Sequence, residues 1–242
     1  LEPGAYLLYL DAWHRHISAL EAPAIREVAL GGPDTATRSR TVAQVRALPL
    51  PAQSPFEWNC DSNIQAWDAL MQRPRPRLAA RAKPQLAAAN LCEIASTAGY
   101  RRLENQLYRV EIHDGGQNPT FKWSRENGSV AYAVVSVTID SVAQRTIVRV
   151  AARGRDANLD LAVHDRVELI DDAAELTKRS GTLFEYVADG DDELELVLAG
   201  VPANALGQDA SLYPVLRRWD HKPTAVGANA LPIVQGTWID LE

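Results

Sequence analysis

The stretch from Leu103 to Val130 reads LENQLYRVEIHDGGQNPTFKWSRENGSV, and it decides how we interpret the rest of the chain. Its first half, Gln106 to His113, alternates apolar and polar residues, which is the pattern of a half-buried strand. We expect a core face with Tyr108, Val110 and Ile112, and a solvent face with Arg109, Glu111 and His113.

The second half of this stretch continues the alternation and ends in a turn signal. Phe121 and Trp123 point to one side of the predicted strand, and Lys122 and Ser124 to the other. Asn127-Gly128 follows, and both residues tolerate the positive φ that a type I′ turn requires. The sequence therefore predicts the central hairpin of an antiparallel sheet.

Strand-like segments occur on both sides of this hairpin, and one segment is typical of a helix. Ser62 to Met71 places its apolar residues on one helical face, and Asp61 or Ser62 can cap it. In the strand after the turn, we expect Ala131, Ala133, Val135, Val137 and Ile139 to face the core. The segments of strand length are Tyr6 to Ile17, Thr37 to Leu48, Leu78 to Ala82, Gln106 to His113, Phe121 to Ser124, Val130 to Ile139, Gln144 to Ala152, Arg166 to Ile170, Thr182 to Ala188, Glu193 to Leu198, Leu212 to Asp220 and Pro232 to Leu241.

These elements predict a mainly β protein with antiparallel sheets, sandwich-like or barrel-like, and one or two short helices. The polar stretch from Arg153 to Asp160 suggests a boundary. We expect a main β domain over residues 1–152, with a helical insertion near 62–71, and a second β subdomain over residues 153–242 that is truncated at its C-terminal end. The chain lacks an initial Met and ends on GTWIDLE, which suggests a fragment of a longer polypeptide.

Composition excludes several classes of function. The chain has 242 residues, 46% of them hydrophobic and 23% charged, with acids and bases interspersed and a net charge of −6. A nucleic-acid binder would normally present a basic face, and the basic run from Arg73 to Lys83 is short and broken by prolines. No apolar run approaches the length of a membrane span, and no signal peptide is recognisable. We expect neither nucleic-acid nor membrane partners.

The two cysteines, Cys60 and Cys92, have no Cys or His at metal-ligand spacing. They are either two buried thiols or one disulfide that closes a loop of about thirty residues. The acidic segment from Asp189 to Glu193 invites a calcium interpretation, but its spacing does not match an EF-hand loop, and a solvated hairpin tip is favoured. We expect no metal and no cofactor.

The best candidate for a reaction centre is the charged face of the predicted strand from Gln106 to His113. Catalytic candidates are His113, Asp114, Glu111 and Glu104, because a carboxylate beside a histidine can orient a general base. Binding candidates are Arg109, Lys122 and Trp123. Alternating charges on a solvated strand give the same pattern, and no Ser or Cys nucleophile is tied to them by spacing. Tryptophans could also stack on sugars, although in strand patterns they are usually core residues.

Several strings resemble an uncharacterised bacterial domain family. They include YLLYLDAW (Tyr6 to Trp13), IREVALGGPDTATR (Ile25 to Arg38), YRRLENQLYRVEIH (Tyr100 to His113), FKWSRENGSV (Phe121 to Val130) and RRWD (Arg217 to Asp220). Members of this family are long proteins, often encoded among phage-tail-like genes, including those of contractile injection systems. The resemblance implies a structural or adaptor part of a tail-like particle, and it supplies no catalytic residues.

Three functions follow as hypotheses. The first is a non-enzymatic structural or interaction module whose partners are other subunits of an assembly or the rest of its own chain. The second is a carbohydrate-recognising domain of a fibre or spike, with a glycan as partner. The third is a hydrolase centred on His113, Asp114 and Glu111. The localisation stays open, and the resemblance implies a bacterial protein in either a cytoplasmic assembly or an extracellular particle.

Overall fold

The computed structural model describes residues 2–30, 36–51, 58–59, 61–72, 76–81, 107–202, 206–223 and 227–241. The chain forms two compact units. Unit 1 comprises residues 1–17 and 38–101, and unit 2 comprises residues 18–37 and 102–242. The described elements are mostly antiparallel strands with two short helices, which confirms the predicted mainly β class.

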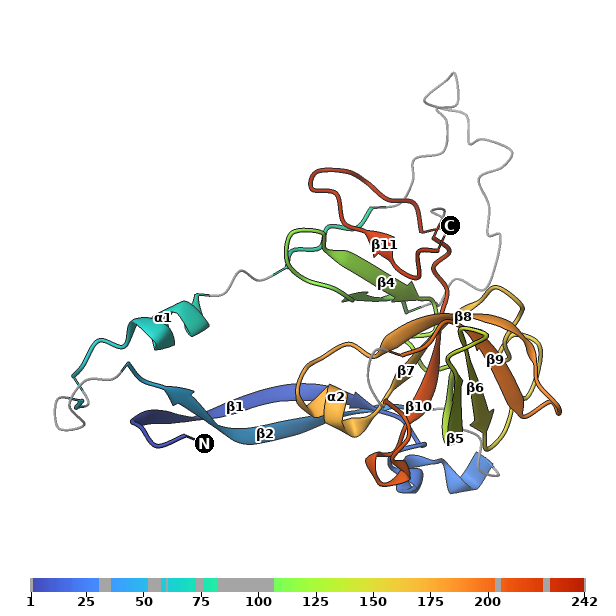
Figure 1. Cartoon of the computed structure of the whole chain (residues 1–242), viewed down its shortest axis with the longest axis horizontal. Helices are drawn as coiled ribbons and strands as arrows, with labels where there is room; N and C mark the ends of the chain where they lie inside the picture. The colour runs from blue at the N-terminus through green and yellow to red at the C-terminus, as the bar shows by residue number, and fades with distance from the viewer. Residues whose placement is uncertain are drawn as a thin grey trace, which may run out of the picture. The chain divides into compact units, whose positions relative to one another are not determined.

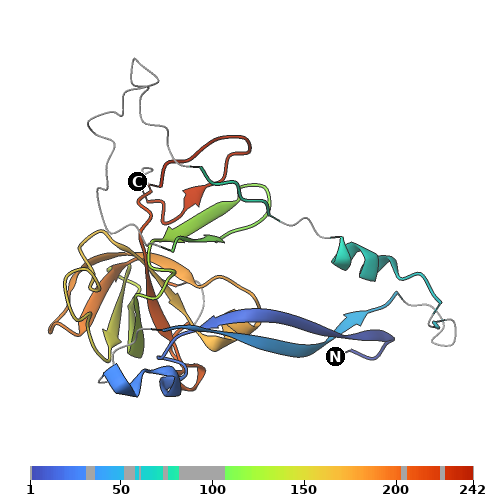
Figure 2. The same ribbon diagram turned by 180° about the vertical axis from the view of Figure 1, so that it is seen from behind.

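Unit 1 contains a long two-stranded ribbon and a short helix. Strands β1 (Tyr6–Ile17) and β2 (Arg38–Pro49) lie side by side in a long ribbon, as Figure 2 shows. They pair antiparallel over twelve consecutive residue pairs. Helix α1 (Gln65–Met71) packs Trp67 edge-on against Tyr9 of the ribbon, with ring centroids 5.2 Å apart. The two predicted strands and the helix are confirmed.

Two local predictions in unit 1 are wrong. The residue before α1 is Ile64 and no side chain caps the helix, because the Ser62 hydroxyl instead accepts the N–H of Asn59 at 2.9 Å. The described residues of the predicted strand at Leu78 to Ala82, which are Leu78 to Arg81, form no strand. Alternation of alanines with single larger side chains is a weak strand signal, because alanine has little strand preference of its own.

Unit 2 is built on a closed six-stranded antiparallel barrel in the order β10-β5-β6-β9-β8-β7 (Figure 1). Its strands are β5 (Ala131–Asp140), β6 (Arg145–Val150), β7 (Arg166–Ile170), β8 (Thr182–Asp189), β9 (Glu195–Ala199) and β10 (Val215–Trp219). The predicted boundary between residues 152 and 153 falls inside this barrel, because strands from both sides of it close the same sheet. A β-barrel needs all its strands to remove its edges, so the polar loop is a connection within one unit.

The barrel interior holds the core of unit 2. Val148, Val167, Leu169, Leu196, Leu198 and Leu216 are fully buried there, together with Phe184 and Tyr186. In β5 the inward residues are Tyr132 and Val134, whereas Val135 is 56% exposed. The expected face of β5 is therefore wrong in its first half. A register shift between Val134 and Ser136 then brings Val137 against the core, because a bulge exchanges the two faces of a strand.

A second sheet in unit 2 has the order β11-β4-β3, with β3 (Arg109–Ile112), β4 (Thr120–Ser124) and β11 (Leu231–Pro232). The strand predicted from Pro232 to Leu241 is wrong, because β11 ends at Pro232 and residues 233–241 form no strand. Asn127 and Gly128 have φ of 54° and 64°, which confirms the turn. Strands β3 and β4 pair antiparallel, which confirms a hairpin within Leu103 to Val130. A further hairpin across Asn127-Gly128 is wrong, however, because β4 pairs with β3 and β11 while β5 belongs to the barrel. The turn carries the chain from the sheet into the barrel.

The remaining helical elements of unit 2 are short. Helix α2 (Asp172–Leu176) follows β7 directly, and the Asp171 carboxylate caps it by accepting the N–H of Ala174 at 2.9 Å. The 3₁₀ turns in the described part of this unit are η1 (Pro23–Ile25), η2 (Val28–Leu30) and η3 (Ala210–Leu212).

Candidate functional site

A dense polar cluster lies where the β3–β4 sheet meets the barrel, and Glu168 is at its centre. Glu168 lies on β7 and is completely buried. Its Oε1 accepts from Lys122 Nζ at 2.5 Å and from the Gly181 N–H at 2.8 Å, and its Oε2 accepts from Trp219 Nε1 at 3.0 Å. Three donors therefore satisfy one buried carboxylate.

The strand register explains how these residues meet. Trp219 lies on β10, which pairs with β7, and Lys122 lies on β4 of the neighbouring sheet. Lys122 Nζ also lies 4.6 Å from the centroid of the Trp219 ring, a cation–π distance. Gly181 can bring its N–H to Glu168 only because it lacks a side chain. A Cβ at this position would lie 2.2 Å from the Leu169 carbonyl oxygen.

The electrostatics of this cluster favour an ion pair. Burial alone would raise the pKa of Glu168, but the positive charges of Lys122 and Arg217 outweigh it and hold that pKa below its usual value. The carboxylate is therefore ionised at neutral pH, and its negative charge is matched inside the protein.

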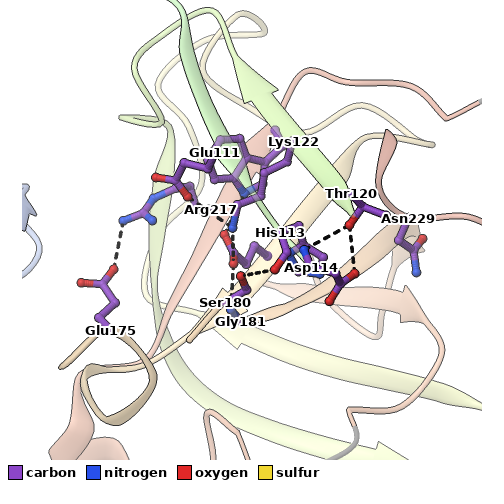
Figure 3. Close-up of polar contacts among 12 residues, drawn as sticks. Glu111, His113, Asp114, Thr120, Lys122, Glu175, Ser180, Gly181, Arg217 and Asn229 are labelled. Atoms are coloured by element: carbon purple, nitrogen blue, oxygen red, sulfur yellow. Dashed lines mark hydrogen bonds and ion pairs between the residues drawn. The ribbon is translucent and has the colours of Figure 1, made fainter. Parts of the chain in front are cut away.

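Glu111, Arg217 and Glu175 add further charges to the cluster, as Figure 3 shows. Glu111 forms an ion pair with Arg109 on its own strand and lies 3.4 Å from Lys122 Nζ. Arg217 Nη2 lies 3.5 Å from Glu175 on α2. Acidic and basic groups alternate through the cluster, so each charge has an opposite charge beside it. We call Glu111, Lys122, Glu168, Arg217 and Trp219 the charge layer.

The charge layer reverses the faces expected for β3. Arg109 and Glu111 turn toward the barrel and are only 20% and 29% exposed, whereas Tyr108 and Ile112 are about 40% exposed. Strand β4 is buried on both faces, because Lys122 and Ser124 are as inaccessible as Phe121 and Trp123. The expected solvent face is wrong, since a partner layer that neutralises the charges makes their burial possible.

Of the predicted catalytic residues, Glu111 belongs to the charge layer, and no described carboxylate is hydrogen-bonded to His113 as a general base would need. The Nδ1 atom of His113 is buried and has no hydrogen-bond partner in the described part of the chain. Asp114 instead accepts from the Thr120 hydroxyl at 2.9 Å, and the Ser180 hydroxyl donates to the His113 carbonyl at 2.6 Å (Figure 3). Burial, aided by the Lys122 charge, lowers the pKa of His113. Glu104 lies outside the described residues.

The predicted binding residues have structural contacts. Lys122 belongs to the charge layer, and Arg109 pairs with Glu111. Trp123 is buried, its ring lying 5.3 Å from the Arg125 guanidinium and 5.9 Å from the Tyr108 ring. Trp219 is also buried, whereas Trp238 is 51% exposed. The aromatic surface of Trp123 and Trp219 is therefore used within unit 2.

Sequence reasoning missed His221, a second buried histidine of this region. Its Nε2–H donates to the Asn229 carbonyl at 2.7 Å, and the Asn229 amide donates to the Leu183 carbonyl at 3.1 Å. Burial lowers the pKa of His221 to about 4, so the ring is neutral at pH 7. The residue follows RRWD directly in a loop, where no periodicity marks it as buried.

One group of acidic residues in the described part of the chain has the proximity that a metal site would need. Carboxylate oxygens of Glu21, Asp172 and Glu175 lie within 4.8 Å of one another. Glu21 also accepts the Ser18 N–H at 3.2 Å, and Glu175 faces Arg217. Oxygen ligands of this kind suit calcium or magnesium, but an adjacent arginine supplies positive charge already. Cys60 and Cys92 lie outside the described residues.

Comparison with known proteins identifies the family. A family model matches residues 2–54 and 52–242, and its description is a family of unknown function, DUF6519. No curated protein and no solved structure matches the chain. None of the described helices has the length and apolar character that crossing a membrane requires.

Proposed function

The chain belongs to the family of unknown function DUF6519, and we propose that it is a non-enzymatic structural or interaction module. Its partners are other subunits of a larger assembly or further parts of its own polypeptide. The resemblance of its sequence to proteins encoded among phage-tail-like genes points to a tail-like particle of a bacterium as that assembly.

The observation that carries this proposal is the ribbon of unit 1. A two-stranded hairpin alone is only marginally stable in water, yet this ribbon is twelve pairs long and exposes large aliphatic side chains. Leu8 is 66% exposed, Leu10 is 65% exposed and Val45 is 74% exposed. Because exposed apolar surface of this kind marks protein contact sites, the ribbon is suited to bind another protein surface.

The charge layer supports the same proposal. Its acids and bases neutralise one another, and its hydrogen-bond donors converge on Glu168. A reaction centre would keep a general base oriented and open to substrate. These groups hold the β3–β4 sheet on the barrel instead, which is what a rigid module needs.

The test is fractionation of particles from cells that make the protein in its native setting. We expect the chain to sediment with a high-mass particle. A Leu10→Glu variant should leave that fraction while its circular dichroism spectrum stays unchanged, because the ribbon is altered only on its exposed side. An Arg40→Glu variant on the opposite side is the control. A wild-type chain found only in the particle-free fraction would contradict the proposal.

A further inference from the structure

The ribbon has two chemically distinct faces. The cross-strand register puts the even-numbered residues of β1 and the odd-numbered residues of β2 on one face, and none of these twelve residues is Asp, Glu, Lys or Arg. We call it the uncharged face. It consists of Tyr6, Leu8, Leu10, Ala12, His14, His16, Ser39, Thr41, Ala43, Val45, Ala47 and Pro49.

The opposite face carries all the charge of the ribbon. Its charged residues are Asp11, Arg15, Arg38, Arg40 and Arg46. It also contacts the rest of unit 1, because Tyr9 packs against Trp67, and Arg46 pairs with Asp11 at 3.0 Å. The ribbon therefore uses its charged face within the unit and leaves large aliphatic side chains exposed on the uncharged face.

The uncharged face is itself divided along its length. The half near Tyr6 and Pro49 carries leucine, valine and alanine, with Leu10 directly across from Val45. The half near the end of β1 carries histidine, serine and threonine, and the Thr41 hydroxyl lies 3.4 Å from His14 Nδ1. Only the first half offers a continuous apolar surface.

We propose that the occupant of this apolar half is the same half of a second copy of the chain. The two ribbons lie face to face about a two-fold axis that runs parallel to their strands. This arrangement places each apolar half against the other, and Leu10 of one copy opposite Val45 of the second copy. The inference rests on the proposed function, for which it names the first partner.

Charge and symmetry favour a second copy over an unrelated protein. A two-fold contact brings the same patch of both copies together, so a patch with a net charge would face a patch of the same net charge and be repelled. The uncharged face avoids this repulsion, although the chain as a whole carries a net charge of −6. The three exposed aliphatic side chains, doubled by the second copy, form the apolar centre of the contact. The alanines, Tyr6 and Pro49 of the same half must add area around them for the contact to reach the ~1,000 Å² at which specific interfaces begin.

The experiment measures the molar mass of the full chain by sedimentation equilibrium over a concentration range of about 1 to 100 μM. We expect a dimer for the wild type. Leu10→Glu and Val45→Lys should each weaken the dimer by at least about tenfold, because each buries an unpaired charge. Arg40→Glu, on the charged face, should dimerise as the wild type does.

The decisive measurement is an equimolar mixture of the two single variants. In a mixed dimer, Glu at position 10 of one copy faces Lys at position 45 of the other, while the second contact keeps its native Leu10 and Val45. We therefore expect the mixture to regain association. A wild-type chain that stays monomeric, or a Leu10→Glu variant that still dimerises, overturns the proposal.

Failure of the dimer proposal can be distinguished from failure of the assembly proposal. If the wild type is monomeric but Leu10→Glu still leaves the particle, the ribbon binds a different subunit and only the second-copy proposal fails. If the wild type dimerises through the ribbon but never enters a particle, the dimer stands and the assembly proposal fails.

Discussion

Glu168 is the buried carboxylate at the centre of the charge layer, and its stability depends on its partners. Lys122 neutralises it, while Gly181 and Trp219 donate to it. Glu168, Lys122 and Trp219 are all at most 1% exposed. Breaking one partner of such a pair leaves the other charge buried without compensation, which is far more destabilising than replacing both.

Glu168→Gln should therefore destabilise the fold by about 3 kcal/mol, because Lys122 remains charged against a neutral amide. Lys122→Met should be less harmful, since Arg217 still balances Glu168. The double variant should lose less than the sum of the two losses. Urea unfolding at pH 7 measures the free energy of each variant, and strictly additive losses would show that the two side chains act independently.

His221 should make the stability depend on pH. Its pKa is lowered to about 4 in the folded chain, whereas an unfolded histidine titrates near ~6.5. The unfolded state therefore binds the proton first, so stability is full above pH ~6.5 and falls as the pH drops toward 4. His221→Gln should flatten that slope in urea titrations. An unchanged slope would assign the effect to other groups, such as His113.

Gly181 should tolerate no side chain. A Cβ there would lie 2.2 Å from the Leu169 carbonyl oxygen, a backbone atom that cannot rotate away. Gly181→Ala should therefore lower the thermal midpoint markedly, by a free energy on the order of 2 kcal/mol or more. Gly115→Ala is the matched control, because nothing lies within 4 Å of the position of its Cβ. Equal effects would contradict the close approach.

At the scale of elements, local patterns predict where strands lie better than which way they face. Strands β1, β2 and β5 to β10 follow from alternation and turn residues. The faces of β3 were reversed because alternation does not say which set is buried when the neighbouring layer is also charged. The conformation of the Asn127-Gly128 turn was predictable from these two residues alone. Which strands the turn connects was not, because the flanking backbone is held by contacts with Asp220 and Leu107, far away in sequence.

The site was predictable only in part for the same reason. Glu111, Lys122 and His113 were identified as a cluster from their positions in sequence, whereas Glu168 and Trp219 lie about fifty residues apart in β7 and β10. Nothing local in the sequence indicates that they meet Lys122. From sequence alone a charged residue is predicted to be exposed, because its counter-charge is known only from the tertiary structure.

Arg153 should hold the β8–β9 hairpin to the loop that precedes β7. Its guanidinium contacts Asp160 at 2.7 Å, Asp189 at 2.6 Å and the Glu193 carbonyl at 3.0 Å. Arg153→Ala should speed hydrogen exchange at the hairpin tip and in this loop, since several tethers are lost together. Arg149→Ala, which removes more exposed pairs, should change exchange little. Equal effects would show that Arg153 is another surface charge.

At the scale of the molecule, the two units differ in how they are stabilised. In the described part of unit 1, Ile17 is the one hydrophobic residue that is fully buried, whereas the barrel of unit 2 has a core of more than ten. The units also differ in charge, since unit 1 has ten basic and six acidic side chains and unit 2 has fifteen basic and twenty-five acidic. A basic, lightly packed unit therefore accompanies an acidic, barrel-based one.

This contrast predicts how amide protection divides along the chain. Amides of β6 and β9, whose Val148, Leu196 and Leu198 are completely buried, should exchange only through global unfolding. Amides of β1 and β2 should exchange sooner, because a ribbon with little core opens locally at a smaller free energy. A second copy on the uncharged face would add protection to the ribbon alone, and mass action makes that protection rise with concentration. Hydrogen exchange followed by mass spectrometry at about 1 and 100 μM separates the two effects. If exchange in β6 and β9 also depends on concentration, association stabilises the whole fold. If exchange depends on concentration in neither pair of strands, no second copy covers the ribbon in solution.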